Sequence, residues 1–231
     1  MDRSAASQVT SAQLAAESGN CGDGRHVRHE PIPSACASVT ETGTTVRLVS
    51  RLIHLNGPPG IGKSTLARRY ADEHFGVLNC DVDVLRTLIG GWSTDFNSAG
   101  AFIRPAALAM IGAYLEQGRD VLLPQMLTNP RELARFEGCA LGVGAHFVER
   151  FFMDVPDAAV LRFNRRGGAT PEDPWHDQVR AIVAANGGDD LLRRYHASLS
   201  RLLDERPEAQ VINSVEGAIE DTYQAFLDSL Q

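Results

Sequence analysis

The sequence predicts an α/β fold in which helices cover both faces of a parallel sheet. From residue 46 onward, short apolar runs of strand type alternate with helical patterns. Residues 57–65, GPPGIGKST, also fit the phosphate-binding pattern GxxxxGK[ST] at every fixed position, and they lie between an apolar run and a helical pattern. Strands and helices that alternate in this way form a parallel sheet with helices on both faces.

The elements follow one another with recognisable boundaries. Gly90 and Gly118 end predicted helices, and Asn129 caps a helix whose first residue is Pro130. Residues 92–98 are expected to form a loop, and the Gly/Pro-rich residues 167–174 a break. The predicted strands are 51–56, 76–80, 120–125, 146–153 and 209–213, and the predicted helices are 64–71, 82–89, 101–116, 130–141, 155–166, 175–185, 189–206 and 215–230.

The P-loop predicts a nucleoside triphosphate site. Glycines without a Cβ let several backbone N–H groups approach phosphate oxygens, Lys63 would reach the β- and γ-phosphates, and the Ser64 hydroxyl would ligate Mg²⁺. ATP and Mg²⁺ are therefore the predicted cofactors. The predicted nucleotide-binding residues are Gly57, Pro58, Pro59, Gly60, Ile61, Gly62, Lys63, Ser64 and Thr65.

Lys63 is the only lysine among the 22 lysine and arginine residues of the chain. Because arginine supplies every other basic charge, a lone lysine at the phosphate position favours a need for a compact ammonium group. The same fact excludes the N-K-x-D guanine motif of GTPase switches. The alternative is a glycine-rich turn that matches the pattern by chance.

Composition limits the function further. At 231 residues and 43% hydrophobic, the chain has room for one α/β domain, assigned here to residues 46–231, and its net charge of −7 argues against a broad nucleic-acid surface. The four cysteines form no C-x-x-C pair, which favours a reducing cytoplasm. No stretch approaches the ~20 apolar residues that span a bilayer, so no membrane partner is expected.

Residues 1–45 differ from the rest, because Ala, Ser, Thr and Gly dominate and apolar periodicity is absent. We expect a disordered extension here. Cys21, His26, His29 and Cys36 could form a zinc site, but their spacing matches no usual zinc finger, which favours a flexible tail.

Ligands of open parallel sheets bind beyond the carboxyl ends of the strands, where the segment 81–86 (DVDVLR) follows the second strand. One of the carboxylates, Asp83 ahead of Asp81, could accept the proton of an attacking hydroxyl, and Arg86 could hold an anionic group. The alternative role is a helix cap, which only one of the two aspartates can fill.

Gln125 ends the third strand, where P-loop motors carry an acidic residue. The glutamine favours a substrate or water contact over hydrolysis, with a solvated turn residue as the alternative. Trp92, Phe96, Phe102 and Arg104 lie between residues 81–86 and this strand, so they are candidates for an acceptor pocket or for the core.

Arg162, Arg165 and Arg166 precede Gly167 and Gly168. A helix that carries arginines toward a glycine hinge suits a lid, at about residues 162–180, that closes over the phosphates and neutralises transferred charge. A solvated basic helix end is the alternative.

These residues resemble the small P-loop kinases related to adenylylsulfate kinase, gluconate kinase, chloramphenicol phosphotransferase and the zeta toxins. Residues 81–86 look like the D-G-D-x-x-R element of adenylylsulfate kinases, with Val82 in place of the glycine. The resemblance implies acceptor-side roles for Asp83 and Arg86, and the arginines at 162–166 resemble the lid of the same group. Residues 121–125, with 135–137 (RFE), are similar to uncharacterised kinases of the AAA type.

The resemblance covers about residues 50–230 in element order. It implies a P-loop fold of three layers with a sheet of strand order 2-3-1-4-5, and adenine near residues 213–215. The expected activity is an ATP-dependent kinase that transfers the γ-phosphoryl group to a hydroxyl of a small molecule. The catalytic candidates are Lys63, Asp83, Arg86, Arg165 and Arg166, and the substrate candidates are Asp81, Gln125 and Arg104.

Two other functions remain open at this point. One is a nucleotide-binding regulatory protein without phosphotransfer, and the other is a nucleotide-sugar kinase like the zeta toxins. The acceptor and the oligomeric state are not indicated by the sequence.

Overall fold

The computed structural model describes residues 49–165 and 174–231. The predicted extension at residues 1–45 with its cysteines and histidines, the residues 167–173 of the predicted break, and Arg166 lie outside the described residues. The domain boundary at residue 46 stays a prediction.

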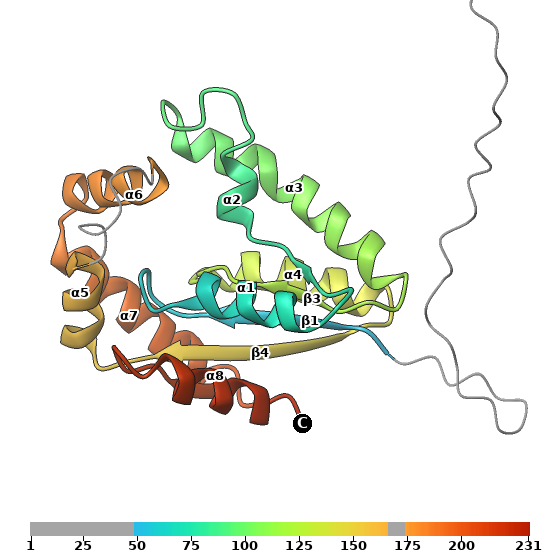
Figure 1. Cartoon of the computed structure of the whole chain (residues 1–231). Coiled ribbons are helices and arrows are strands. Elements are labelled where there is room, and N and C mark those ends of the chain that lie inside the picture. Colours follow the sequence, from blue (N-terminus) through green and yellow to red (C-terminus); the bar gives the residue numbers. More distant parts are fainter. Residues whose placement is uncertain (1–48, 166–173) are drawn as a thin grey trace, which may run out of the picture. The chain divides into compact units, whose positions relative to one another are not determined.

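Five parallel strands form the sheet, in the order β2-β3-β1-β4-β5 (Figure 1). This order confirms the predicted one. The central strand β1 pairs with β3 on one side and β4 on the other, so that His54 lies opposite Leu123 and Glu149. The strands are β1 (Arg51–Asn56), β2 (Leu78–Asn79), β3 (Val121–Leu123), β4 (His146–Met153) and β5 (Gln210–Asn213).

Helices cover both faces of the sheet, as predicted. The core between the sheet and α3, α4 and α7 includes Leu52, Ile111, Phe136 and Leu199, and the opposite core, under α1 and α8, includes Leu55 and Phe226. The helices are α1 (Lys63–Glu73), α2 (Val82–Arg86), α3 (Phe96–Leu115), α4 (Pro130–Gly142), α5 (Pro156–Arg165), α6 (Pro174–Ala185), α7 (Asp189–Asp204) and α8 (Ile219–Asp228).

A third, smaller core joins α5, α6 and α7. It contains Val160, Phe163, Val183 and Leu192. Helix α6 packs on this core and stands on the same side of the molecule as the connection between α2 and α3 (Figure 1).

Several boundaries differ from the predicted ones for local reasons. Helix α3 begins at Phe96, inside the expected loop, because the Asp95 carboxylate caps it by accepting a hydrogen bond from the Ser98 N–H at 3.1 Å. Helix α8 begins at Ile219 rather than near residue 215, because Gly217 has a φ of +85° and cannot belong to a helix. The predicted Asn129 cap and the Pro130 start of α4 are both present.

Helix α3 is long and apolar enough, by length and composition, to cross a membrane. The sequence expectation that no stretch approaches this length is therefore wrong for α3. One face of α3 is buried against the sheet through Ile103, Ala107, Ile111 and Leu115. A buried core helix meets the same length and composition test.

The packing of α3 predicts the cost of two substitutions. Ile111→Ala should lower the free energy of unfolding by about 2–5 kcal/mol, because the Ile111 side chain is fully buried. Phe102→Ala on the same helix should change it by less than about 0.5 kcal/mol, because Phe102 is 68% exposed. Urea unfolding measures both. Equal effects of the two substitutions would contradict this packing of α3.

Candidate active site

The P-loop runs from the end of β1 to the start of α1 at the carboxyl edge of the sheet. Gly57 has a φ of +145°, and a Cβ there would lie 2.3 Å from the Phe152 carbonyl oxygen. Gly62 has a φ of +104° and forms the left-handed N-cap of α1. Only glycine fits these two positions without strain, so they shape the loop as an anion cradle at a helix N-terminus.

Lys63 folds back over this loop. Its ammonium Nζ donates to the carbonyl oxygens of Gly57 and Pro58 at 2.8 and 2.9 Å, and the side chain is buried. The positive charge is thus held inside the loop where phosphate oxygens would gather. Ser64 is half-buried and Thr65 is exposed at the start of α1.

Asn56, which sequence reasoning did not single out, fixes the start of the loop. Its side-chain oxygen accepts the N–H groups of Gly57 at 2.9 Å and Leu127 at 3.1 Å, and its amide donates to the Leu127 carbonyl at 3.0 Å. The side chain is completely buried. The P-loop is therefore tied to the segment that follows β3. A polar residue at the end of an apolar strand was the available sequence signal.

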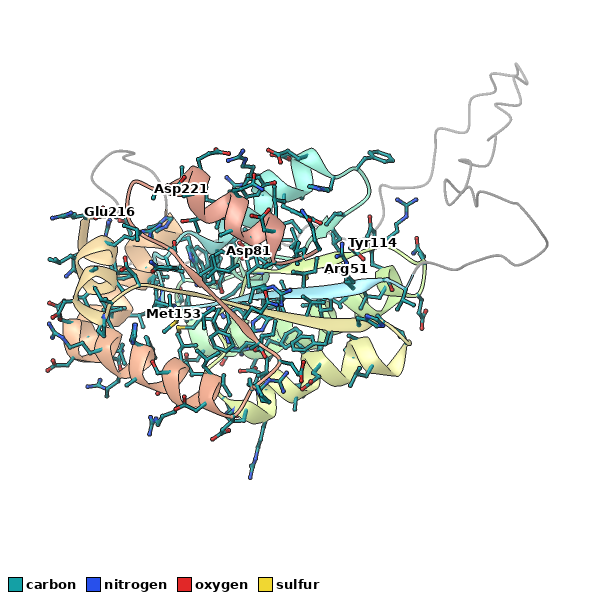
Figure 2. All side chains as sticks on the ribbon, turned by 90° about the horizontal axis from the view of Figure 1, so that it is seen from below. Arg51, Asp81, Tyr114, Met153, Glu216 and Asp221 are labelled. Carbon is teal, nitrogen blue, oxygen red and sulfur yellow. The ribbon has the colours of Figure 1, made fainter. Side chains whose placement is uncertain are left out.

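Two cavities lie on either side of the P-loop and share Gly60, Gly62 and Thr65. The smaller cavity has a volume of about 290 Å³ and reaches Arg162, Ser214 and Glu216, of which Glu216 is labelled in Figure 2. The larger cavity has a volume of about 590 Å³. Its lining includes Pro59, Lys63, Ser64, Arg68, Asp81, Asp83, Arg86, Phe96, Arg104, Gln125, Trp175, His176 and Arg180.

The two aspartates after β2 have different surroundings. Asp81 (labelled in Figure 2) caps α2, since its carboxylate accepts the N–H groups of Asp83 at 3.0 Å and Val84 at 3.4 Å. Asp83 is not engaged in capping. Its carboxylate lies 3.7 Å from the Arg86 guanidinium, and a third of its side chain is exposed.

Asp83 has the electrostatics of a proton acceptor. Burial raises the pKa of Asp83 from 3.8 to about 6, and the nearby Asp81 adds to the rise. The positive charges of Arg86 and Lys63 oppose it. A carboxylate with a pKa near 6 is ionised at neutral pH yet basic enough to take a proton from a reacting hydroxyl.

Arg86 is buried on an aromatic wall. Its guanidinium carbon lies 4.0 Å from the centre of the Phe96 ring and 5.3 Å from that of Trp175. Its Nε atom has no hydrogen-bond partner among the residues that the structure describes. A Cβ on Gly100 would lie 3.0 Å from Arg86 Nη2, so the close approach of α3 fixes the guanidinium.

The aromatic wall also joins α6 to the connection between α2 and α3. The Trp175 ring is centred 5.7 Å from that of Trp92 and 5.4 Å from that of Phe96. The Gln178 amide donates to the Ser93 carbonyl at 3.1 Å. Among the predicted acceptor-pocket residues, Phe96 and Arg104 line the larger cavity, whereas Phe102 is exposed on α3.

The remaining predicted residues divide between the cavities. Gln125 is buried at the larger cavity, where Arg104 pairs with Glu132 at 2.7 Å. Arg162 donates to the Ser214 carbonyl at 2.9 Å, and Arg165 pairs with Glu216 at 3.0 Å, both beside the smaller cavity. Arg162, which the sequence did not place among the catalytic candidates, lies against the P-loop, with Nη2 3.1 Å from a Cβ placed on Gly62.

A protein-family model described as an AAA domain matches residues 52–184 of the chain. The chain belongs to this AAA domain family. The match runs from β1 into α6 and so includes the P-loop, Asp83 and Gln125. The predicted resemblance to small P-loop kinases is confirmed at the level of family and fold. No curated protein sequence matches the chain.

Solved structures match the chain at low sequence identity. A candidate kinase from Chloroflexus aurantiacus is 14% identical, with 80% of this chain and 97% of that one covered and a TM-score of 0.55. A gluconokinase from Sinorhizobium meliloti is 18% identical over 80% of this chain and 93% of its own, with a TM-score of 0.49. A chain of an RNA repair complex is 20% identical, with 62% of this chain and 46% of that one covered and a TM-score of 0.48. The protein described here thus spans less than half the length of that chain.

The raised pKa of Asp83 predicts how Asp83→Asn changes stability with pH. The folded protein binds this proton more tightly than the unfolded chain, so the stability that Asp83 contributes is fully present below about pH 4 and is lost as the pH rises through about 6. Asp83→Asn should therefore stabilise the protein more at pH 7.5 than at pH 4. Urea unfolding at both pH values measures the difference.

Asp72→Asn is the matched control, because Asp72 is an exposed aspartate on α1. The difference between the two pH values should be smaller for Asp72→Asn than for Asp83→Asn. An equal pH response of the two variants would contradict the raised pKa.

Proposed function

We propose that this protein is an ATP-dependent kinase that phosphorylates a hydroxyl group of a small acidic molecule. One observation carries the proposal: the larger cavity brings the P-loop lysine, Lys63, and a carboxylate with a raised pKa, Asp83, to the same space. A nucleotide-binding protein without chemistry has no need for such a carboxylate, because burying it costs stability.

The two cavities suggest separate places for the two substrates. The nucleoside would occupy the smaller cavity, beside Ser214 and Arg162, and the acceptor the larger one. The γ-phosphoryl group would lie between them at Gly60 and Gly62, which line both cavities. This arrangement favours direct transfer from ATP to an acceptor.

In the proposed reaction, the acceptor hydroxyl oxygen bonds to the γ-phosphorus while the bond from that phosphorus to the β–γ bridging oxygen breaks. Asp83 takes the hydroxyl proton, and ADP leaves with the bridging oxygen. Lys63 and the P-loop N–H groups stabilise the charge that moves onto the leaving phosphate. Arg162 and Arg165 hold the nucleoside side of the loop from α5.

The donor set fits Mg²⁺. The Ser64 hydroxyl and the Asp81 carboxylate line one cavity, and Mg²⁺ prefers oxygen ligands. Mg²⁺ is usually bound by one or two protein groups together with substrate phosphates. The ion would supply charge neutralisation at the phosphates.

The charge of the larger cavity supports an acidic acceptor. Lys63, Arg68, Arg86, Arg104 and Arg180 line it, against the two carboxylates of Asp81 and Asp83. Arg104 is paired with Glu132 and Arg180 with Asp177, so that Lys63, Arg68 and Arg86 carry the excess. Arg68 is exposed at the rim, and Arg86 is the cation nearest to Asp83. A carboxylate or phosphate group on the acceptor would complement this excess of positive charge.

The proposal predicts that Lys63→Ala lowers phosphoryl transfer at least about hundredfold, because it removes a charge that acts on the transferred phosphate. The measurement is ADP release with Mg²⁺-ATP across pools of hydroxyl compounds, in which each acid is paired with its neutral amide. An acid-dependent signal that Lys63→Ala abolishes is the expected result.

Arg201→Ala is the control for the lost charge, because Arg201 lies on α7 and lines neither cavity. Its turnover should equal that of the wild type. ATP binding without turnover in any pool would favour the regulatory function, and turnover only with nucleotide sugars would favour a zeta-toxin-like kinase.

A further inference from the structure

Helix α6 presents an apolar stripe to the larger cavity. Trp175, Val179, Ile182 and Val183 recur at the spacing of one helix face, and all four line this cavity. Val183 is buried in the small core that joins α5, α6 and α7, and Val179 packs against that core. Ile182 is half-buried and belongs to none of the three cores that the described residues form. The stripe is therefore wider than the core that it covers.

Other elements extend this apolar surface. Phe96 from α3, Met126 from the segment after β3 and Tyr195 from α7 also line the cavity, and each is half-buried. Apolar surface that remains in contact with water is unfavourable. A cavity that held only phosphates and the hydroxyl groups of a sugar would have no use for such a surface. Its presence indicates an acceptor that covers it with apolar groups of its own.

The buried Arg86 lies at one end of the stripe. Its guanidinium carbon is 5.3 Å from the centre of the Trp175 ring, and its Nη2 is 3.7 Å from a carboxylate oxygen of Asp83. Arg86 is 4% exposed, and the Phe96 and Trp175 rings beside it offer its N–H groups no oxygen. A carboxylate of the acceptor would supply the missing oxygens. Because Asp83 is the proposed base, the acid and the reacting hydroxyl lie at the same end of the acceptor.

The remainder of the acceptor has the length of the stripe to occupy. Trp175 and Ile182 are seven residues apart on α6, which is an axial distance of about 10 Å. The polar residues that α6 adds to the lining, His176 and Arg180, fall at one edge of the stripe, and Arg180 pairs with Asp177. The apolar path along the helix is therefore continuous.

We propose that the acceptor is an amphiphilic hydroxy acid, whose carboxylate binds Arg86 and whose apolar chain lies along Trp175, Val179 and Ile182. The inference rests on the proposed function, because it names the acceptor of that reaction. Polyhydroxylated acids are disfavoured, since their hydroxyl groups would leave water without finding hydrogen-bond partners on the stripe. Ile182 is accordingly a residue that determines specificity.

The first test is the affinity of the full chain for 2-hydroxy acids from lactate to 2-hydroxyoctanoate, measured by calorimetry without nucleotide. Each added methylene group should tighten binding about fourfold, because it moves from water onto the stripe. Gluconate has the same carbon chain as 2-hydroxyhexanoate with more hydroxyl groups, and it should bind no more tightly than lactate. The neutral amide of 2-hydroxyoctanoate should bind at least about tenfold more weakly than the acid.

The second test repeats the series with Ile182→Asn, which places an amide on the stripe. The gain for each methylene group should fall below about twofold. Leu191→Asn is the matched control, because Leu191 is half-buried, packs against the same small core and lines neither cavity. Its series should keep the gain of the wild type. An equal response of the two variants would contradict the specificity role of Ile182.

The wild type alone can overturn the inference, whether or not the variants fold. Equal affinity for gluconate and 2-hydroxyhexanoate would do so. Turnover is read separately, as ADP release from Mg²⁺-ATP with the same acids. The expected gain in affinity without ADP release would contradict the proposed kinase while supporting the amphiphilic ligand. Faster ADP release with gluconate than with 2-hydroxyhexanoate would support the kinase and overturn the amphiphilic acceptor.

Discussion

The three hydrogen bonds of Asn56 hold together the parts from which both cavities are made. The side-chain oxygen accepts from the first peptide of the P-loop and from Leu127, and the amide donates back to Leu127, in the segment between β3 and α4. Because β1 and β3 are neighbouring parallel strands, their carboxyl ends meet at one edge, and Asn56 joins them there without solvent contact. The phosphate cradle and the wall that carries Gln125 therefore keep a fixed separation.

At this edge of the sheet, positive charge is concentrated beside Asp83, whose ionised form the fold does not favour. The pKa of Asp83 is raised by burial, so the folded chain gives up stability at neutral pH to keep an ionised group there. The carboxylate of Asp81, two residues earlier, caps α2. Two chemically identical side chains thus serve different purposes, because only one of them meets the exposed N–H groups of a helix start.

The sequence predicted the fold order and the P-loop because both are local patterns, legible from the spacing of glycines and apolar runs. The boundaries of α3 and α8 were missed because single side chains and one positive φ decide them. The sequence could not decide whether Asp81 or Asp83 caps α2, because either aspartate suits a helix cap. The contacts of Asn56 were missed because they join residues far apart in sequence, although a polar residue at the end of an apolar strand was a visible signal.

The two tryptophans of the chain both lie where α6 meets the connection between α2 and α3. Trp175 belongs to the helix beside the larger cavity and Trp92 to the opposing connection, with their ring centres 5.7 Å apart. The tryptophan emission of the unlabelled protein consequently originates at this one contact. Any movement of α6 relative to α2 changes the surroundings of both emitters at once, so the molecule carries its own optical reporter of how open the larger cavity is.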